Sequence, residues 1–512
     1  MNQSNIKALA IVPIVLFISI YLGVGAASSQ TETLMVVGGV SLVAVIAILG
    51  ARIWLLIPLV LFSNLFFRWI PGNLALRELA FVVTIAGVTL MALTRRIHFN
   101  FRFGLPHLLG GVIVICIAQV YARHPTGLSI FGSGSVGGRP YFIVGLAVMG
   151  SMILSSILVR PQDLLSARTF AVVGGVFTIV AQWVAYIPGM GYIMTIAFGT
   201  GNMGFMDTND QSAEGAGRNV AGQATSKALP PIIVAYVSPL KAILFSRWTF
   251  IAGFAIFGAL ISGFRSQIAL SGLIFGFGIY YWSGIKGFIA GTLIACISLI
   301  FIITLNIFYP LPPKVQRALS FIPGSWEQKY IDDGEDSTDW RVTIWEEALF
   351  TDRWIENKVL GDGLGFTKEE LSMQQGLQDG SLSLGGFGGL SDQQVSILVN
   401  GDYHSGPVSL IRTIGYVGLV LFVIATLVLA VACHKLLRRY KGSPYFGVLA
   451  IFLVPAIAHP FYFLFIFGGF SLDIPFFFLN LGFYGLLRNN FHDLHIMDDN
   501  SDEESQLSEN HA

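Results

Sequence analysis

The sequence predicts an all-α fold, a polytopic integral membrane bundle of helices with one large polar loop. Hydrophobic residues make up 54% of the 512-residue chain and charged residues only 12%, a composition that would leave a soluble fold with a large apolar surface in water. Apolar runs recur that approach the roughly twenty residues a helix needs to cross a bilayer. They lack the alternation of a transmembrane β-barrel, so helices are the expected spanning elements.

About 12 to 14 helices are expected to span the membrane. The opening run 8–27 resembles a signal peptide, but its apolar core is long for one, which favours a first span. The predicted spans lie near 8–27, 33–51, 53–68, 74–94, 104–121, 141–159, 167–187, 229–245, 248–264, 266–283, 287–308, 406–433, 446–468 and 472–487.

Basic residues lie on alternate sides of these spans, which predicts an orientation with both termini in the cytoplasm. The basic residues of the even-numbered connections are Arg52, Arg95, Arg96, Arg102, Arg160, Arg168, Lys241, Arg247, Lys286, Lys435, Arg438, Arg439, Lys441 and Arg488. A smaller loop over 188–230 and the large acidic, glycine-rich loop then lie on the outer side. The large loop is expected to fold as short helices that cap an outward-facing cavity.

Five regions follow from this pattern. They are N-terminal transmembrane helices (1–246), core helices joined by a short Arg-bearing linkage (247–308), the large loop (309–405), C-terminal helices (406–490) and a disordered acidic cytoplasmic tail (491–512).

Several cations and one histidine are predicted at the outer face. Arg265 lies in a short linkage between two spans, Arg341 in the large loop, and His404 where that loop re-enters the membrane; Arg139 and Arg77 are near the same boundary. Guanidinium groups match the oxygens of a diphosphate, and an imidazole can take a proton from an attacking hydroxyl near neutral pH. Snorkelling arginines, a loop salt bridge for Arg341 and an exposed loop histidine are the competing interpretations.

The spacing around His404 resembles the O-antigen ligase and O-antigen polymerase family. In that family a histidine ends the large periplasmic loop and precedes a Gly-x-x-Gly start of the next span, as His404 precedes Gly415 and Gly418 here. Upstream, the family's Arg, Trp and glycine series has its counterparts, in the same order, in Arg341, Trp345, Gly361, Gly363 and Gly365. The resemblance covers 247–435 in detail and the remainder only as hydropathy.

The resemblance implies transfer of a glycan from an undecaprenyl-diphosphate carrier to an acceptor sugar, at the periplasmic face of a bacterial inner membrane. It implies an inverting reaction without metal, nucleotide or other cofactor. His404 would be the catalytic base, and Arg265, Arg341 and Arg139 would bind the diphosphate. The acceptor would be lipid A core for a ligase or a growing polysaccharide for a polymerase, with envelope polysaccharide assembly proteins as possible partners. The chain departs from the family at Phe264, where a small residue is usual, and at Ala269, where the family has Leu.

The remaining motifs give no specific prediction of a functional site. The series Gly361, Gly363 and Gly365 lacks the Gly-Lys-Ser/Thr end of a phosphate-binding loop and is interpreted as loop turns. The acids of 332–339 form a run without the spacing of a calcium loop, so they predict a solvated acidic face. His459 is either functional or a kink histidine bonded to backbone. The three cysteines, Cys116, Cys296 and Cys433, are expected to pack in apolar helices, and the zero formal net charge gives no sign of nucleic acid.

Two other classes remain open at the level of sequence. A polytopic transporter or flippase would also carry glycines and prolines within its helices, although we find no convincing internal repeat. A relative without catalysis could serve as a scaffold in an envelope assembly.

Overall fold

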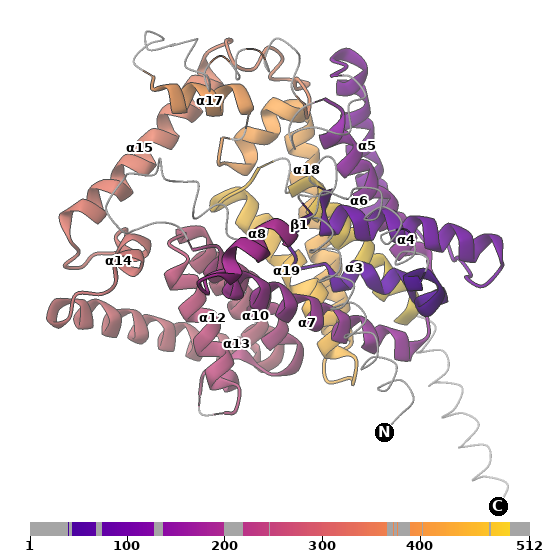
Figure 1. Cartoon of the computed structure of the whole chain (residues 1–512), viewed down its shortest axis with the longest axis horizontal. Coiled ribbons are helices and arrows are strands. Elements are labelled where there is room, and N and C mark those ends of the chain that lie inside the picture. Colours follow the sequence, from indigo (N-terminus) through magenta and orange to yellow (C-terminus); the bar gives the residue numbers. More distant parts are fainter. Residues whose placement is uncertain are drawn as a thin grey trace, which may run out of the picture.

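The computed structural model describes residues 39, 44–67, 74–126, 137–198, 219–244, 246–365, 372, 376, 390–401, 403–469 and 473–491. These residues are mostly helical and contain almost no strand, which confirms the all-α class (Figure 1). Seven of the described helices are long and apolar enough to cross a membrane: α4, α5, α6, α7, α13, α18 and α19.

The helices and strands follow one another along the described parts of the chain. Their bounds are η1 Gly50–Leu55, α3 Leu56–Leu59, β1 Phe66–Phe67, β2 Leu74–Ala75, α4 Leu76–Leu93, α5 Leu105–Arg123, α6 Arg139–Ser156, α7 Pro161–Val184, α8 Met190–Phe198, α10 Val220–Tyr236, α11 Pro239–Ile243, α12 Thr249–Ile261, α13 Arg265–Phe308, α14 Pro313–Leu319, α15 Gln328–Phe350, α17 Asp392–Asn400, α18 Gly406–Arg439 and α19 Phe446–Phe465. A last helix covers 473–491.

Local sequence signals set several of these boundaries. Proline stands in the first turn of α5, α6, α7 and α18, where its missing N–H costs nothing. Ser391 caps α17 by accepting a hydrogen bond from the N–H of Gln394, and α17 ends at Gly401 in the left-handed conformation.

Most predicted spans coincide with helices, but two predictions were wrong. Near 53–68 the helix stops at Leu59, and β1 then pairs with β2 in antiparallel register. Helix α10 begins at Val220 rather than 229, so the end of the predicted 188–230 loop is a buried helix. The polar residues of α10 made this stretch resemble a loop in the sequence. In the structure Thr225 and Ser226 have hydrogen-bond partners on neighbouring helices. The span predicted over 8–27 lies outside the described residues.

Helix α13 is two apolar helical segments joined at one glycine. A straight helix of its 44 residues would measure about 66 Å, roughly twice the hydrocarbon thickness of a bilayer. Gly284 has φ 71° and ψ −167°, which only glycine adopts readily, and the chain turns sharply there. A Cβ placed on Gly276 would lie 3.5 Å from the Phe288 ring, which shows that the two segments approach each other across the turn. The separate predicted spans 266–283 and 287–308 flank this turn.

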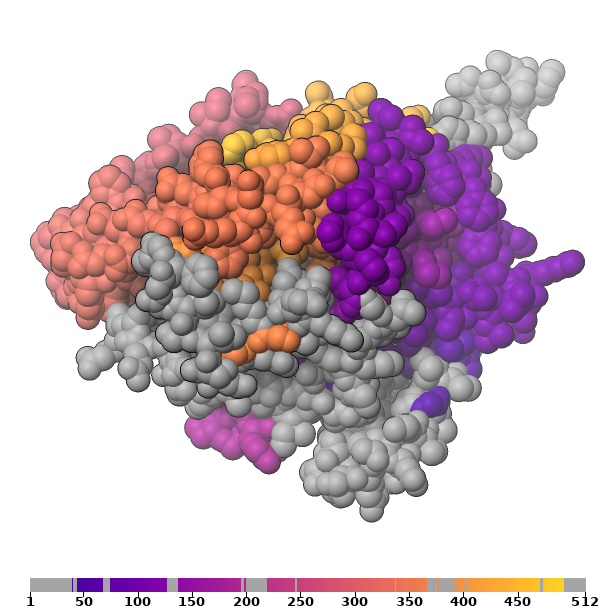
Figure 2. Space-filling model, turned by 90° about the horizontal axis from the view of Figure 1, so that it is seen from above, coloured from indigo at the N-terminus to yellow at the C-terminus, as the bar shows by residue number. Residues whose placement is uncertain are grey.

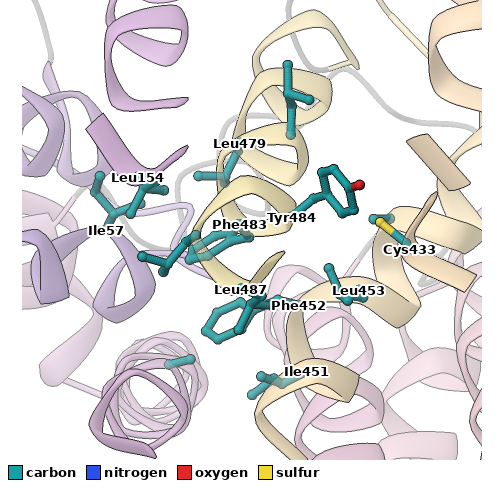
Figure 3. Packing of buried hydrophobic residues seen from close by; sticks show 14 of the residues in the cluster. Ile57, Leu154, Cys433, Ile451, Phe452, Leu453, Leu479, Phe483, Tyr484 and Leu487 are labelled. Carbon is teal, nitrogen blue, oxygen red and sulfur yellow. The ribbon is translucent and has the colours of Figure 1, made fainter. Parts of the chain in front are cut away.

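The core is built around α19 and the last helix, which lie at the centre of the bundle. The rings of Phe452 and Phe483 stack with centroids 4.1 Å apart, and Figure 3 shows the last helix between α19 on one side and Leu154 and Ile57 on the other. Cys433 is buried in this core as expected, whereas Cys296 is exposed on α13, so the packing prediction was wrong for Cys296.

Residues of the predicted large loop form a separate helical layer. Helices α14, α15 and α17 lie on the side of the molecule away from α3 and α4 (Figure 1). The expectation of short helices was wrong for α15, which has 23 residues and already begins at Gln328, within the acidic stretch. A hydrophobic cluster joins this layer to α18; its buried members are Ile344, Ala348, Ile355, Leu390, Val395, Leu398, Val399, Tyr403, Val408 and Ile411.

Candidate functional site

Arg265 contacts α15 near the beginning of that helix. It is the first residue of α13, and its guanidinium donates to Ser320 Oγ at 3.0 Å and to the Gly334 carbonyl at 3.5 Å. A Cβ at position 334 would overlap this guanidinium, so a glycine there lets α15 approach it. The Phe321 ring lies 5.6 Å from the guanidinium carbon. These contacts hold the Arg265 side chain against α15.

A second arginine lies next to Arg265 and has its own counter-ion. Arg317 of α14 contacts Asp333 of α15 at 2.7 Å, and the charge of Arg317 is close enough to act on Arg265. The Asp333 carboxylate therefore acts on two guanidinium groups, those of Arg317 and Arg265.

The junction between α14 and α15 is fixed by hydrogen bonds. Gln316 donates to the Glu327 carboxylate at 3.1 Å and accepts from the backbone N–H of Glu327 at 3.1 Å. The hydrogen bond from Lys329 holds the pKa of the Glu327 carboxyl below its usual range. Helix α15 thus begins from a defined point beside Arg265.

Arg341 lies on the same side of α15 as Gly334. The two positions are two helical turns apart, a rise of about 10 Å, and residues seven apart share a helix face. Arg341 is half-buried. Its side chain therefore belongs to the face of α15 that covers Arg265.

His404 contacts α15 beside Arg341. Its imidazole lies between two aromatic rings, with centroid distances of 5.9 Å to Trp340 and 5.7 Å to Phe467. Trp345 donates from Nε1 to the carbonyl of Tyr403 at 2.8 Å, which ties the chain before His404 to α15. The φ angle of His404 is 53°, in the left-handed region, which residues other than glycine adopt uncommonly. Such strain is typical of functional positions.

Arg265, Arg341 and His404 are thus gathered along one helix, although 139 positions separate the first from the last. Arg265 contacts α15 at Gly334, His404 contacts it at Trp340, and Arg341 lies beside that tryptophan. The arrangement can hold an anion between two guanidinium groups and bring an imidazole near it.

Arg139 has a different environment. It is the first residue of α6 and forms a buried ion pair with Glu78 of α4 at 3.2 Å, with side-chain exposures of 5% and 10%. Arg77, which is half-buried, precedes Glu78 in α4. The structure therefore gives Arg139 a carboxylate partner, and its role in binding a diphosphate stays a prediction.

The Arg139→Met substitution is expected to destabilise the protein by about 3 to 5 kcal/mol, because it leaves the Glu78 carboxylate buried without its counter-ion. Adding Glu78→Gln should recover most of that loss. The melting temperatures of the two variants in the same detergent give the comparison. If Arg139→Met alone melts like the wild type, the ion pair is not a structural element.

The glycines of the family-like series hold a loop inside a broken helix. Helix α18 is interrupted at Gly415, which has φ 73° and ψ 179°. Residues 358–363 enter this break: the backbone N–H groups of Tyr416, Asp362 and Gly363 are bonded to the carbonyls of Lys358, Arg412 and Thr413 at 2.8, 2.7 and 3.1 Å. The backbone groups freed by the break are thus paired by the loop.

The small size of these glycines permits the insertion. A Cβ at Gly361 would lie 2.5 Å from the backbone nitrogen of Ile414, and one at Gly365 would lie 2.5 Å from the carbonyl oxygen of Gly137. Gly363 accepts from the buried Arg412 at 3.0 Å, and Gly418 packs on Ile414 one turn after the break. Gly361 and Gly363 both have positive φ angles, which agrees with their interpretation as loop turns. That interpretation did not include the insertion of the loop into α18.

Helices α5 and α6 hold the other side of this loop. Arg123 donates to the carbonyls of Leu360 and Gly361 at 3.1 and 2.7 Å, and the Tyr141 hydroxyl accepts from the N–H of Leu364 at 3.0 Å. Figure 2 shows the orange surface of this region directly against purple surface near the start of the chain. The far end of the α15 layer is therefore anchored to the bundle.

His459 pairs with a residue that sequence reasoning did not single out. Its Nε2 lies 3.0 Å from Oδ1 of Asp473, a carboxylate at the start of the last helix. The alternative of a kink histidine bonded to backbone did not include this carboxylate partner. No motif indicated Asp473, Ser320, Arg317 or Asp333, because each depends on a distant element for its partner.

No protein-family model matches the chain, and a comparison with curated proteins finds no similar sequence.

Proposed function

We propose that this protein is a membrane glycosyltransferase that moves a glycan from an undecaprenyl-diphosphate carrier to an acceptor sugar. The observation that carries the proposal is the course of α15, which contacts Arg265 at Gly334 and His404 at Trp340 and bears Arg341 close to the second contact. A diphosphate and an acceptor hydroxyl are the chemical groups that two guanidinium side chains and an imidazole suit together.

In this proposal Arg265 and Arg341 bind the diphosphate of the donor. Negative charge grows on the phosphate oxygen as its bond to the anomeric carbon breaks, and positive groups already in place stabilise that charge without reorganisation. The contacts of Arg265 with Ser320 and Gly334 give its guanidinium such a fixed place. The energy of the reaction is stored in the donor, so no nucleotide is consumed.

His404 acts as the base. The oxygen of the acceptor hydroxyl attacks the anomeric carbon, its proton passes to the imidazole of His404, and the carrier diphosphate leaves with the bonding electron pair. Attack opposite to the leaving group inverts the anomeric centre. Under the predicted orientation this occurs at the periplasmic face of a bacterial inner membrane.

A transporter or flippase is the other candidate, and the broken helix α18 is the feature that would favour it. Carriers use unwound backbone groups in such helices to bind substrate. Here residues 358–363 already occupy hydrogen-bonding groups on both sides of Gly415. This supports a structural break and therefore favours the transferase.

The test is a transfer assay with purified protein in lipid nanodiscs. Undecaprenyl-diphosphate oligosaccharide is supplied with either lipid A core or a second lipid-linked oligosaccharide, in the presence of EDTA and without nucleotide. We expect a new glycosidic product by mass spectrometry, together with free undecaprenyl diphosphate. Capped lipid A core would identify a ligase, and a lengthened lipid-linked glycan a polymerase. Absence of product with both acceptors, combined with movement of the donor across proteoliposomes, would replace the proposal with a flippase.

A further inference from the structure

A buried histidine and aspartate lie directly behind the turn that carries His404. His459 of α19 and Asp473 of the last helix approach to 3.0 Å, and their side chains are only 4% and 7% exposed. The rings of Phe422 and Phe476 surround the imidazole at 6.3 and 5.0 Å. A polar pair in such apolar surroundings is costly, so its presence calls for a use beyond packing.

The aspartate also fixes the chain between α19 and the last helix. Its second oxygen, Oδ2, accepts from the backbone N–H of Gly469 at 2.8 Å, and its own N–H donates to the carbonyl of Gly469 at 3.0 Å. One carboxylate therefore joins His459 to the turn that follows α19.

That turn contacts the His404 segment at two points. The backbone of Gly468 is enclosed between Asp473 and Gly406, since a Cβ at Gly468 would lie 2.6 Å from both Oδ2 of Asp473 and Cα of Gly406. The neighbouring ring, Phe467, stacks on the imidazole of His404 with an angle of 27° between the planes. A displacement of Asp473 would therefore reach His404 through close contacts.

We propose that His459 and Asp473 are positioning residues for His404. The pair holds the 466–469 turn against Gly406, the turn keeps Phe467 stacked on the imidazole, and His404 is thereby kept in its left-handed conformation. A strained residue keeps such a conformation only when its surroundings determine it. The inference rests on the proposed function for what His404 does, whereas the positional effect can be measured separately.

The decisive variant is Asp473→Ala, which removes both carboxylate contacts. We expect kcat for glycan transfer to fall about 100-fold, the usual effect of misplacing a reacting group by about 1 Å, while KM for the donor stays unchanged. Hydrogen–deuterium exchange of the 403–409 backbone should accelerate. Asp473→Asn can still accept from Gly469 and donate to His459, so it should retain most of the wild-type kcat and exchange rate.

Asn490→Ala is the matched control. Asn490 lies at the opposite end of the same helix, is buried, and makes three hydrogen bonds to backbone groups, at 2.8, 3.1 and 2.8 Å. It should lower the melting temperature without changing kcat or the exchange of 403–409. The proposal is overturned if Asp473→Ala leaves the exchange of 403–409 as in the wild type, or if Asn490→Ala accelerates it equally. Accelerated exchange in Asp473→Ala alone, in a protein without any transfer activity, would support the positioning role and refute the proposed function.

Discussion

The His404→Asn substitution is expected to lower the rate of glycan transfer by about 10²- to 10⁴-fold, the range that a general base contributes. Asparagine tolerates the left-handed backbone that His404 adopts at φ 53°, so the variant should fold like the wild type while lacking a group that can take the proton. The measurement is the initial rate in the nanodisc assay, normalised to the amount of protein that elutes as a single species.

A second histidine provides the control for this variant. His124 follows α5 and is predicted on the same side of the membrane as His404. His124→Ala should transfer glycan at the wild-type rate. Full activity in His404→Asn would remove His404 from the mechanism, and equal losses in the two variants would point to a general effect of histidine replacement.

The Gly415→Ala substitution is expected to lower the free energy of unfolding by more than about 3 kcal/mol. Its φ of 73° and ψ of 179° lie in a region that is essentially restricted to glycine. A Cβ would also overlap the backbone of Val359, which lies in the inserted loop. Because this loop anchors the far end of the α15 layer, transfer should be lost together with stability. Thermal unfolding in detergent gives the first effect and the nanodisc assay the second.

The Gly442→Ala substitution separates the cost of the backbone conformation from the cost of the steric overlap. Gly442 also has a positive φ, 87°, but a Cβ there would have no atom within 4 Å. This variant should lose only about 1 to 2 kcal/mol, the cost of a left-handed backbone. Similar losses in both variants would mean that the insertion of 358–363 into α18 contributes little.

The helices that the sequence predicts best are those with long, uninterrupted apolar runs. Helices α4, α5 and α6 lie within a few residues of the predicted 74–94, 104–121 and 141–159, because hydropathy and length suffice to select such runs. The start of helix α10 was predicted wrongly for the opposite reason. Its serines and threonines are satisfied by other helices, so polarity there reports a protein interior rather than a loop.

The candidate site was predictable only in part. Arg265, Arg341 and His404 could be selected because they lie at the predicted outer boundary and because their order and spacing resemble those of one family. The partner of each residue could not be selected. Ser320 for Arg265, Glu78 for Arg139 and Asp473 for His459 are joined by tertiary contacts across separate elements. No periodicity relates such positions.

The insertion of residues 358–363 into α18 also dictates an order of assembly. Arg412 and Gly363, which meet in the finished structure, are 49 positions apart, and the earlier of the two leaves the ribosome first. The α15 layer is therefore synthesised before the helix that receives its loop. Assembly is complete only when α18 has formed on both sides of residues 358–363.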